Sequence, residues 1–190
     1  MFFETVHLLI NTLFGFFSGL FLLRFLMQKF RVPFGNEIGR FVIAFTDWLV
    51  KPLRAAVPGI AGFDWASLIA AWLSTFVGIA LAWVISRADY SLNPDSLISL
   101  LIISFFQLLT TIIWLFKGAL IAFVVLSWVA PQAPVMMMLM SFTRPLLSPI
   151  SRVIPPISGF DLSPLFALLG LQIADIIVNH LTGETLRLFG

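Results

Sequence analysis

Four long apolar stretches dominate this sequence and restrict it to folds that a lipid bilayer can hold. They run from about 6 to 27, 65 to 85, 97 to 130 and 162 to 181. A hydrocarbon core about 30 Å thick needs roughly 20 apolar residues for each helical span. Only 11% of the residues are charged, compared with about 25% in soluble domains. The chain therefore lacks the polar surface of a soluble enzyme or a disordered protein, and we predict an all-α integral membrane protein.

The third stretch decides the number of spans. As one helix, residues 97–130 would extend roughly 50 Å, which exceeds the hydrocarbon thickness. The segment either crosses once, with a protruding or tilted extension, or ends a span near Phe116 and re-enters the membrane after Lys117. These alternatives give four and five spans.

The distribution of basic residues favours four spans. In that arrangement segments 28–64 and 131–161 share one side and carry seven of the 11 basic residues, whereas the other side carries only Arg87 and Arg187. The positive-inside rule assigns the basic side to the cytoplasm. We therefore predict both termini on the periplasmic side of a bacterial inner membrane. The N-terminus lacks the positive start of a signal peptide, so its apolar stretch is expected to remain as a span.

The two halves of the chain are similar to each other. Residues 45–68 match residues 142–165 at ten of 24 ungapped positions, an offset of 97. An offset of 103 aligns the preceding spans and places 104–130 over 1–27, which again favours a single crossing. Because each copy contains two spans, we predict two parallel tandem repeats related by an axis along the membrane normal.

Each repeat is expected to contain a span, a connector and a second span. In the first repeat, 1–95, the predicted elements are spans at about 6–27 and 65–85 and an interfacial helix at about 37–50. In the second repeat, 96–190, they are spans at about 104–130, with a leading extension from 97, and at about 162–181, joined by a connector at about 135–161.

The two connectors differ in polarity. Residues 37–50 place apolar side chains on one face at helical spacing, which predicts an amphipathic helix in the membrane interface. Asn36 is expected to cap this helix and Pro52 to end it. The segment from Met136 to Met140 has almost no polar face, so the second connector is expected either to be buried against the spans or to dip into the bilayer.

A Gly-Phe-Asp sequence follows each connector helix. Gly62 and Gly159 permit a turn that is costly for other residues, and Asp64 and Asp161 are placed to cap the next helix. A turn and a cap are the favoured interpretation. The alternative is that the paired motifs form a cytoplasmic docking surface.

Together, the Leu-Leu-Arg ending of the first span, the Pro-Leu-Arg segment and the Pro-x-Ile-x-Gly-Phe-Asp motif resemble the YggT family of small integral membrane proteins. Bacterial members often carry two such repeats. The second repeat departs from the pattern, because Ser127 lies near the place of Arg24 and Ser151 opposite Arg54. The motif residues are Arg24, Pro52, Leu53, Arg54, Pro58, Gly62, Phe63 and Asp64 in the first copy, and Pro149, Arg152, Pro155, Gly159, Phe160 and Asp161 in the second.

This resemblance implies a protein that is not an enzyme and uses no cofactor. Bacterial members are associated with osmotic-stress tolerance and ion balance, and plastid relatives look like assembly factors for a membrane cytochrome complex or are tied to nucleoid and division organisation. We therefore expect a role in ion and osmotic homeostasis. The alternative is a scaffold or assembly factor. The expected partners are the lipid bilayer and other membrane proteins or copies of the chain itself.

Three charged residues within the spans are candidates for function, because a charge inside a membrane is costly. Arg24 is close enough to the cytoplasmic end of its span to extend toward water. Lys117 and Asp175 are expected at similar depths, which favours a buried structural ion pair. A proton or cation path is the alternative, and it would also use Gln107, Gln172 and Asn179.

Small residues at equivalent positions predict a helix crossing. Gly15 and Gly19 in the first span align with Gly118 and Ala122, and this spacing lets helices approach closely in membranes. We therefore expect the first helices of the two repeats to cross there.

Several other chemistries have no support in the sequence. There is no Cys, and the two His residues, His7 and His180, lie near opposite ends of the chain, so no metal site is expected. Basic residues are scattered rather than gathered on one face, which argues against nucleic-acid binding.

Overall fold

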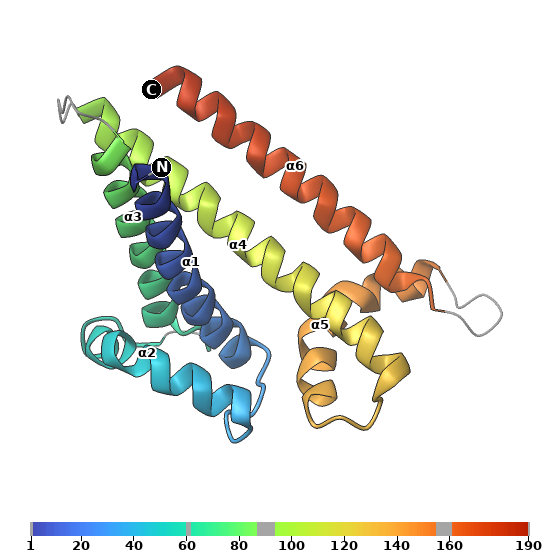
Figure 1. The fold of residues 1–190 in the computed structure, drawn as a ribbon. Coiled ribbons are helices and arrows are strands. Elements are labelled where there is room, and N and C mark those ends of the chain that lie inside the picture. Colours follow the sequence, from blue (N-terminus) through green and yellow to red (C-terminus); the bar gives the residue numbers. More distant parts are fainter. Residues whose placement is uncertain (1, 60–61, 87–93, 155–160, 190) are drawn as a thin grey trace.

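The computed structural model describes residues 2–59, 62–86, 94–154 and 161–189, which form helices and no strand (Figure 1). Four of the helices are long and apolar enough to cross a membrane: α1, α3, α4 and α6. Both chain ends lie at one end of these helices, and α2 and α5 lie at the other. The six helices are α1 (Phe2–Lys29), α2 (Glu37–Ala56), α3 (Trp65–Ser86), α4 (Pro94–Val129), α5 (Val135–Val153) and α6 (Ser163–Phe189).

The long third stretch forms one helix. α4 contains 36 residues and continues without a break through Lys117. The alternative with a break at this residue is therefore wrong, and the four apolar helices agree with the four predicted spans.

Both connectors contain a helix. The prediction that Pro52 ends the first of these helices is wrong. Asn36 caps α2 by accepting a hydrogen bond from the Gly39 backbone N–H at 2.6 Å, as expected. The helix then continues past Pro52 to Ala56. Proline removes only one backbone donor from a helix, and the turn after it is closed by the Val57 backbone N–H, which donates to the Leu53 carbonyl at 2.7 Å. Two prolines likewise lie inside α5.

Apolar packing joins the spans in two pairs. α1 packs mainly on α3, and α4 mainly on α6, while α3 and α4 supply most of the contact between the repeats. One buried cluster joins Phe21 and Leu22 of α1 to Ala70 of α3 and Leu108 of α4. A second cluster brings α1 and α2 together with Met138 and Phe142 of α5. The connector helices thus share a core with the ends of the spans.

The predicted glycine crossing is wrong. A methyl group added at Gly15, Gly19 or Gly118 would meet no neighbouring atom within 4 Å, so no helix backbone approaches these residues closely; Ala122 and Gly118 instead line a cavity. The close approach lies at Gly78 of α3, where an added Cβ would be 2.6 Å from Cβ of Phe14. The reason is that the main partner of α1 is α3 and not α4.

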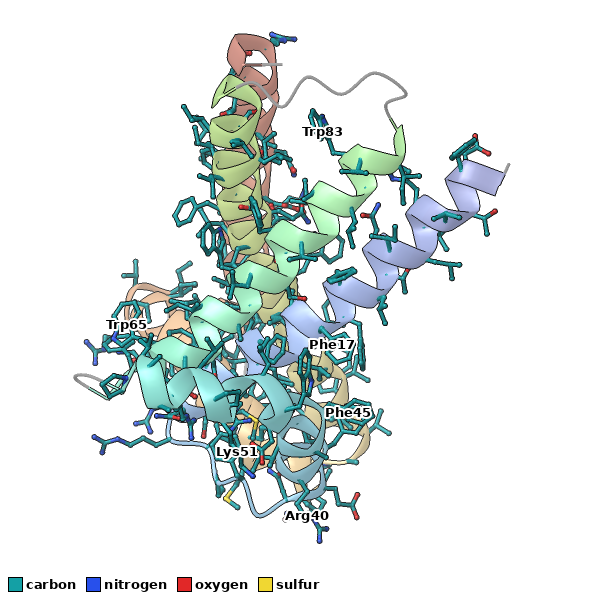
Figure 2. The ribbon with its side chains drawn as sticks, turned by 90° about the vertical axis from the view of Figure 1, so that its left-hand side faces the viewer. Phe17, Arg40, Phe45, Lys51, Trp65 and Trp83 are labelled. Carbon is teal, nitrogen blue, oxygen red and sulfur yellow. The ribbon has the colours of Figure 1, made fainter. Side chains whose placement is uncertain are left out.

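The side chains of α2 divide between the spans and the solvent. Phe45 packs against Phe16 of α1, with ring centroids 6.3 Å apart, and Trp48 packs against Phe17 at 6.1 Å. Figure 2 shows Phe45 on the side of α2 that faces Phe17, whereas Arg40 lies away from the spans. The aromatic face of α2 is therefore continuous with the apolar surface of α1.

Candidate functional site

Asp64 links three helices of the first repeat. Only 2% of the residue is exposed, and its carboxylate accepts hydrogen bonds from Arg54 Nη2 at 2.5 Å and Nε at 3.3 Å. It also accepts a bond from the Ser67 hydroxyl at 2.6 Å and a longer one from the Ser67 backbone N–H at 3.4 Å. Arg54 Nη2 donates in addition to Gln28 of α1 at 3.1 Å. The predicted cap is therefore present, and it is also an ion pair.

The rest of the first motif supports this turn. Gly62 has a φ of +78°, a conformation that favours glycine. Phe63 stacks on Phe25 of α1 at 6.2 Å between centroids, and Lys29 Nζ lies 3.6 Å from the centre of the Phe63 ring. Pro58 is exposed. The motif residues described here therefore join the start of α3 to the end of α1.

The surroundings of Asp64 stabilise its charged form. Burial acts to raise its pKa, but the hydrogen bonds from Arg54 and Ser67 outweigh that effect, so the pKa is lowered from the usual 3.8. The pKa of Asp47 is lowered as well, first by its hydrogen bond from Lys51 and, against the effect of burial, by Arg24. Both carboxylates are therefore anions at neutral pH.

The expectation that Arg24 extends toward water is wrong, because its side chain is buried. Only 5% of the residue is exposed, and Nη1 donates to Thr46 Oγ1 at 2.7 Å and to Asp47 Oδ1 at 2.8 Å. Its Nε is buried and has no hydrogen-bond partner among the described residues. The reason is that α2 folds back beneath the end of α1 and covers the guanidinium group. Arg24 therefore fixes the connector to the span.

The second repeat lacks this arrangement. The equivalents of Arg24, Asp47 and Arg54 are Ser127, Arg144 and Ser151. Asp161 is exposed and accepts a hydrogen bond from the Ser163 backbone N–H at 2.8 Å, so it caps α6, and it forms no ion pair with the residues that the structure describes. Pro149 and Arg152 lie within α5. Pro155, Gly159 and Phe160 lie outside the described residues.

The ion pair of the second repeat lies between its spans. Lys117 Nζ is 2.7 Å from Asp175 Oδ2 and donates to Gln172 Oε1 at 2.9 Å. Asn179 donates to the other oxygen of Asp175 at 3.2 Å. Lys117 and Asp175 are 8% and 7% exposed. The pair expected from the sequence is thus formed, and Gln172 and Asn179 surround it, whereas Gln107 lies elsewhere.

Gln107 lines a polar cavity between α1, α3 and α4. The cavity has a volume of about 290 Å³. Within it Ser18 Oγ lies 2.7 Å from Thr75 Oγ1 and donates to the Ala71 carbonyl at 3.2 Å. The polar residues of its lining are Asn11, Ser18, Thr75, Gln107 and Thr111.

Sequence reasoning missed the contribution of α1 to this cavity. Asn11, Phe14, Gly15 and Ser18 all line it, and they follow the i, i+3, i+4, i+7 spacing of one helix face. That stripe was a signal, because it places two polar residues on the same face of an apolar span. The described residues contain no group of three or more His, Asp or Glu side chains placed to hold a metal.

These features define a helical membrane protein whose connector helices lie against the ends of its four spans. The chain belongs to the CCB3/YggT family, whose model matches residues 3–85 and again residues 102–182. The double match is consistent with the two repeats expected from the sequence.

Similar proteins occur in several bacteria. An uncharacterized protein of Pseudomonas aeruginosa is 34% identical over 93% of this chain and 90% of its own length. The uncharacterized protein YggT of Escherichia coli K12 is 31% identical over 96% of this chain and 93% of its own. A Vibrio alginolyticus protein from the proC 3' region is 29% identical over 95% and 96%. No solved structure gives a significant match.

Proposed function

We propose that this is a non-enzymatic protein of the bacterial inner membrane that supports ion and osmotic homeostasis. In this proposal the two repeats are parallel, the connector helices lie in the cytoplasmic interface and both termini are periplasmic. The position of α2 and α5 at one end of the spans, with the termini at the other, supports that orientation.

The polar cavity between α1, α3 and α4 carries the functional proposal. Its lining offers amide and hydroxyl oxygens, which can replace part of the hydration shell of a monovalent cation. Polar groups inside a membrane are functional candidates because they are costly there. The Lys117–Asp175 pair is a weaker candidate for a cation path, because each charge is already neutralised by the other. We therefore assign the cation-holding role to the cavity.

Cation flux into liposomes tests this role. The purified full-length protein is expected to pass K⁺ or Na⁺ faster than empty liposomes do. Gln107→Leu and Thr111→Val should reduce that flux by removing lining oxygens. Thr110→Val is the matched control, because Thr110 makes the same type of hydroxyl-to-carbonyl bond within α4 but is outside the lining. A flux equal to that of empty liposomes would exclude direct transport.

A scaffold or assembly role is the second candidate. It is favoured by apolar side chains exposed on α5, where Met137, Met140 and Val153 are 75%, 50% and 80% exposed. Crosslinkers placed at Met137 and Met140 in intact membranes test it. Capture of a defined membrane protein, lost when the linker is moved to exposed Leu8 on α1, would support this role. Capture of lipid alone would oppose it.

A further inference from the structure

A separate cavity lies between the end of α4 and the connector helix α5. It has a volume of about 500 Å³ and is distinct from the cavity within the spans. One part of its lining is apolar and the other is polar and positively charged. The apolar part includes Phe123, Met140 and Leu147, and the polar part includes Arg144, Ser148 and Ser151.

Two hydrogen-bond donors of this lining are unused. Arg144 makes no ion pair or hydrogen bond within the described chain, and neither does the Ser148 hydroxyl. They are four residues apart on α5, so they share one helix face. By contrast, the Ser151 hydroxyl already donates to the Ser148 carbonyl at 3.3 Å. Arg144 and Ser148 can thus bind one acceptor together.

The acceptor must come from outside α5. The helix contains no Asp or Glu but has two arginines, Arg144 and Arg152. In the first repeat the position equivalent to Arg144 holds Asp47, which binds Arg24 and Lys51. In the second repeat the position equivalent to Arg24 holds Ser127, whose hydroxyl donates to the Val124 carbonyl of its own helix. The charge at this connector position is thus paired within the first repeat, where it is the Asp47 carboxylate, whereas the Arg144 guanidinium of the second repeat has no partner among the described residues.

The chemistry of the cavity selects the ligand. A guanidinium group and a hydroxyl suit a phosphate group, which Arg binds with charge-assisted hydrogen bonds. The apolar part of the lining suits the glycerol and acyl chains next to that phosphate. In the orientation proposed above, on which this step rests, α5 lies at the cytoplasmic surface of the membrane, where anionic lipid headgroups attract basic residues. We propose that this cavity binds the phosphate headgroup of an anionic phospholipid.

Native mass spectrometry of the full-length protein in detergent tests the proposal. Phosphatidylglycerol is expected to bind at least about tenfold more tightly than phosphatidylcholine, and Arg144→Gln should reduce its affinity by about tenfold. Ser148→Ala should have a smaller effect, and Arg144→Lys should restore part of the affinity because it keeps the charge. The matched control is Arg152→Gln, since Arg152 is exposed on the same helix but outside the lining.

Other outcomes would overturn the proposal. Equal losses for Arg144→Gln and Arg152→Gln would show general attraction to a basic helix. Equal binding of phosphatidylcholine would remove the role of headgroup charge, and displacement of the lipid by millimolar inorganic phosphate would show a small-anion site. The elution volume and melting temperature of Arg144→Gln are expected to equal those of the unaltered protein, which shows that its lower affinity is not caused by misfolding. Arg144→Lys is the control for charge, because it keeps the positive charge at the same position. The cavity proposed to hold cations shares no lining residue with this one. A negative result for lipid binding would therefore leave the cation proposal unaffected, and the reverse also holds.

Discussion

The two repeats place their ion pairs at different levels of the same architecture. In the first, Arg24–Asp47 and Arg54–Asp64 fix the connector to the ends of the spans. In the second, Lys117–Asp175 joins the two spans themselves. The two repeats thus have the same helix pairing but different ion pairs, which lie at the connector in the first repeat and between the spans in the second.

Equivalent positions make this comparison more specific. The offsets of 103 and 97 align Lys117 with Phe14 and Asp175 with Gly78. In the first repeat these two residues pack against each other, since a Cβ added at Gly78 would lie 2.6 Å from Cβ of Phe14. The same point in the two helix pairs is therefore occupied by an aromatic ring on a glycine in one repeat and by an ion pair in the other. This equivalence supports the repeat registers found in the sequence.

The largest expected effect follows from breaking the pair in the membrane. Asp175→Ala leaves Lys117 as a buried charge without its partner, which should lower the free energy of unfolding by about 3–5 kcal/mol. The double variant Lys117→Phe/Asp175→Gly copies the first repeat and should recover most of the loss, because apolar packing can replace a buried ion pair. Unfolding in mixed micelles measures both. A double variant no more stable than Asp175→Ala would contradict the equivalence of the two contacts.

The next effect concerns the connectors. Arg24→Met should lower the free energy of unfolding by about 3 kcal/mol, since it removes one partner of a largely buried pair. Arg144→Gln, at the connector of the second repeat, should change it by less than about 0.5 kcal/mol, because Arg144 is exposed and has no described protein partner. The same unfolding assay compares them. Similar losses would mean that both connectors are held by their arginines.

A smaller difference is expected between the two caps. Asp64→Ala removes a cap together with its bonds to Arg54 and should cost about 2 kcal/mol, a value reduced because the Arg54 side chain is 42% exposed. Asp161→Ala removes only a cap and should cost about 1 kcal/mol or less. Thermal unfolding of both variants checks the order. A larger loss for Asp161→Ala would show that the second motif has a role beyond capping.

The acid sensitivity of the first repeat has a definite sign. The folded protein lowers the pKa of Asp64 below 3.8, so the stability that Asp64 contributes is complete above that pH and is lost as the pH falls through the lowered pKa. Asp64→Asn should therefore make unfolding less dependent on pH below about 4. Stability measured from pH 7 to pH 3 tests this. A slope identical to that of the unaltered protein would assign the acid sensitivity to other carboxylates.

Sequence patterns were sufficient where a residue acts within its own segment. Apolar length located the spans, and the Gly-Phe-Asp motif located the caps at Asp64 and Asp161. The pairing of Lys117 with Asp175 could be predicted from the sequence, because two opposite charges within apolar helices have few other charged residues to pair with. The burial of Arg24 could not be predicted from the sequence, since it depends on how α2 folds beneath α1. The polar cavity was missed for the same reason, because it combines single residues from three helices.

The smallest expected effect tests the absence of a close crossing between the first helices of the repeats. An added methyl group at Gly15 or Gly118 meets no atom within 4 Å, so Gly15→Ala and Gly118→Ala should each change the free energy of unfolding by less than about 0.5 kcal/mol. Gly78→Ala is the contrasting variant, because its Cβ would overlap Phe14 and overpacking is costly. If Gly118→Ala were instead as destabilising as Gly78→Ala, the backbones of α1 and α4 would have to approach each other in the membrane. The two repeats would then be joined by a glycine contact and not by the apolar side chains of α1, α3 and α4.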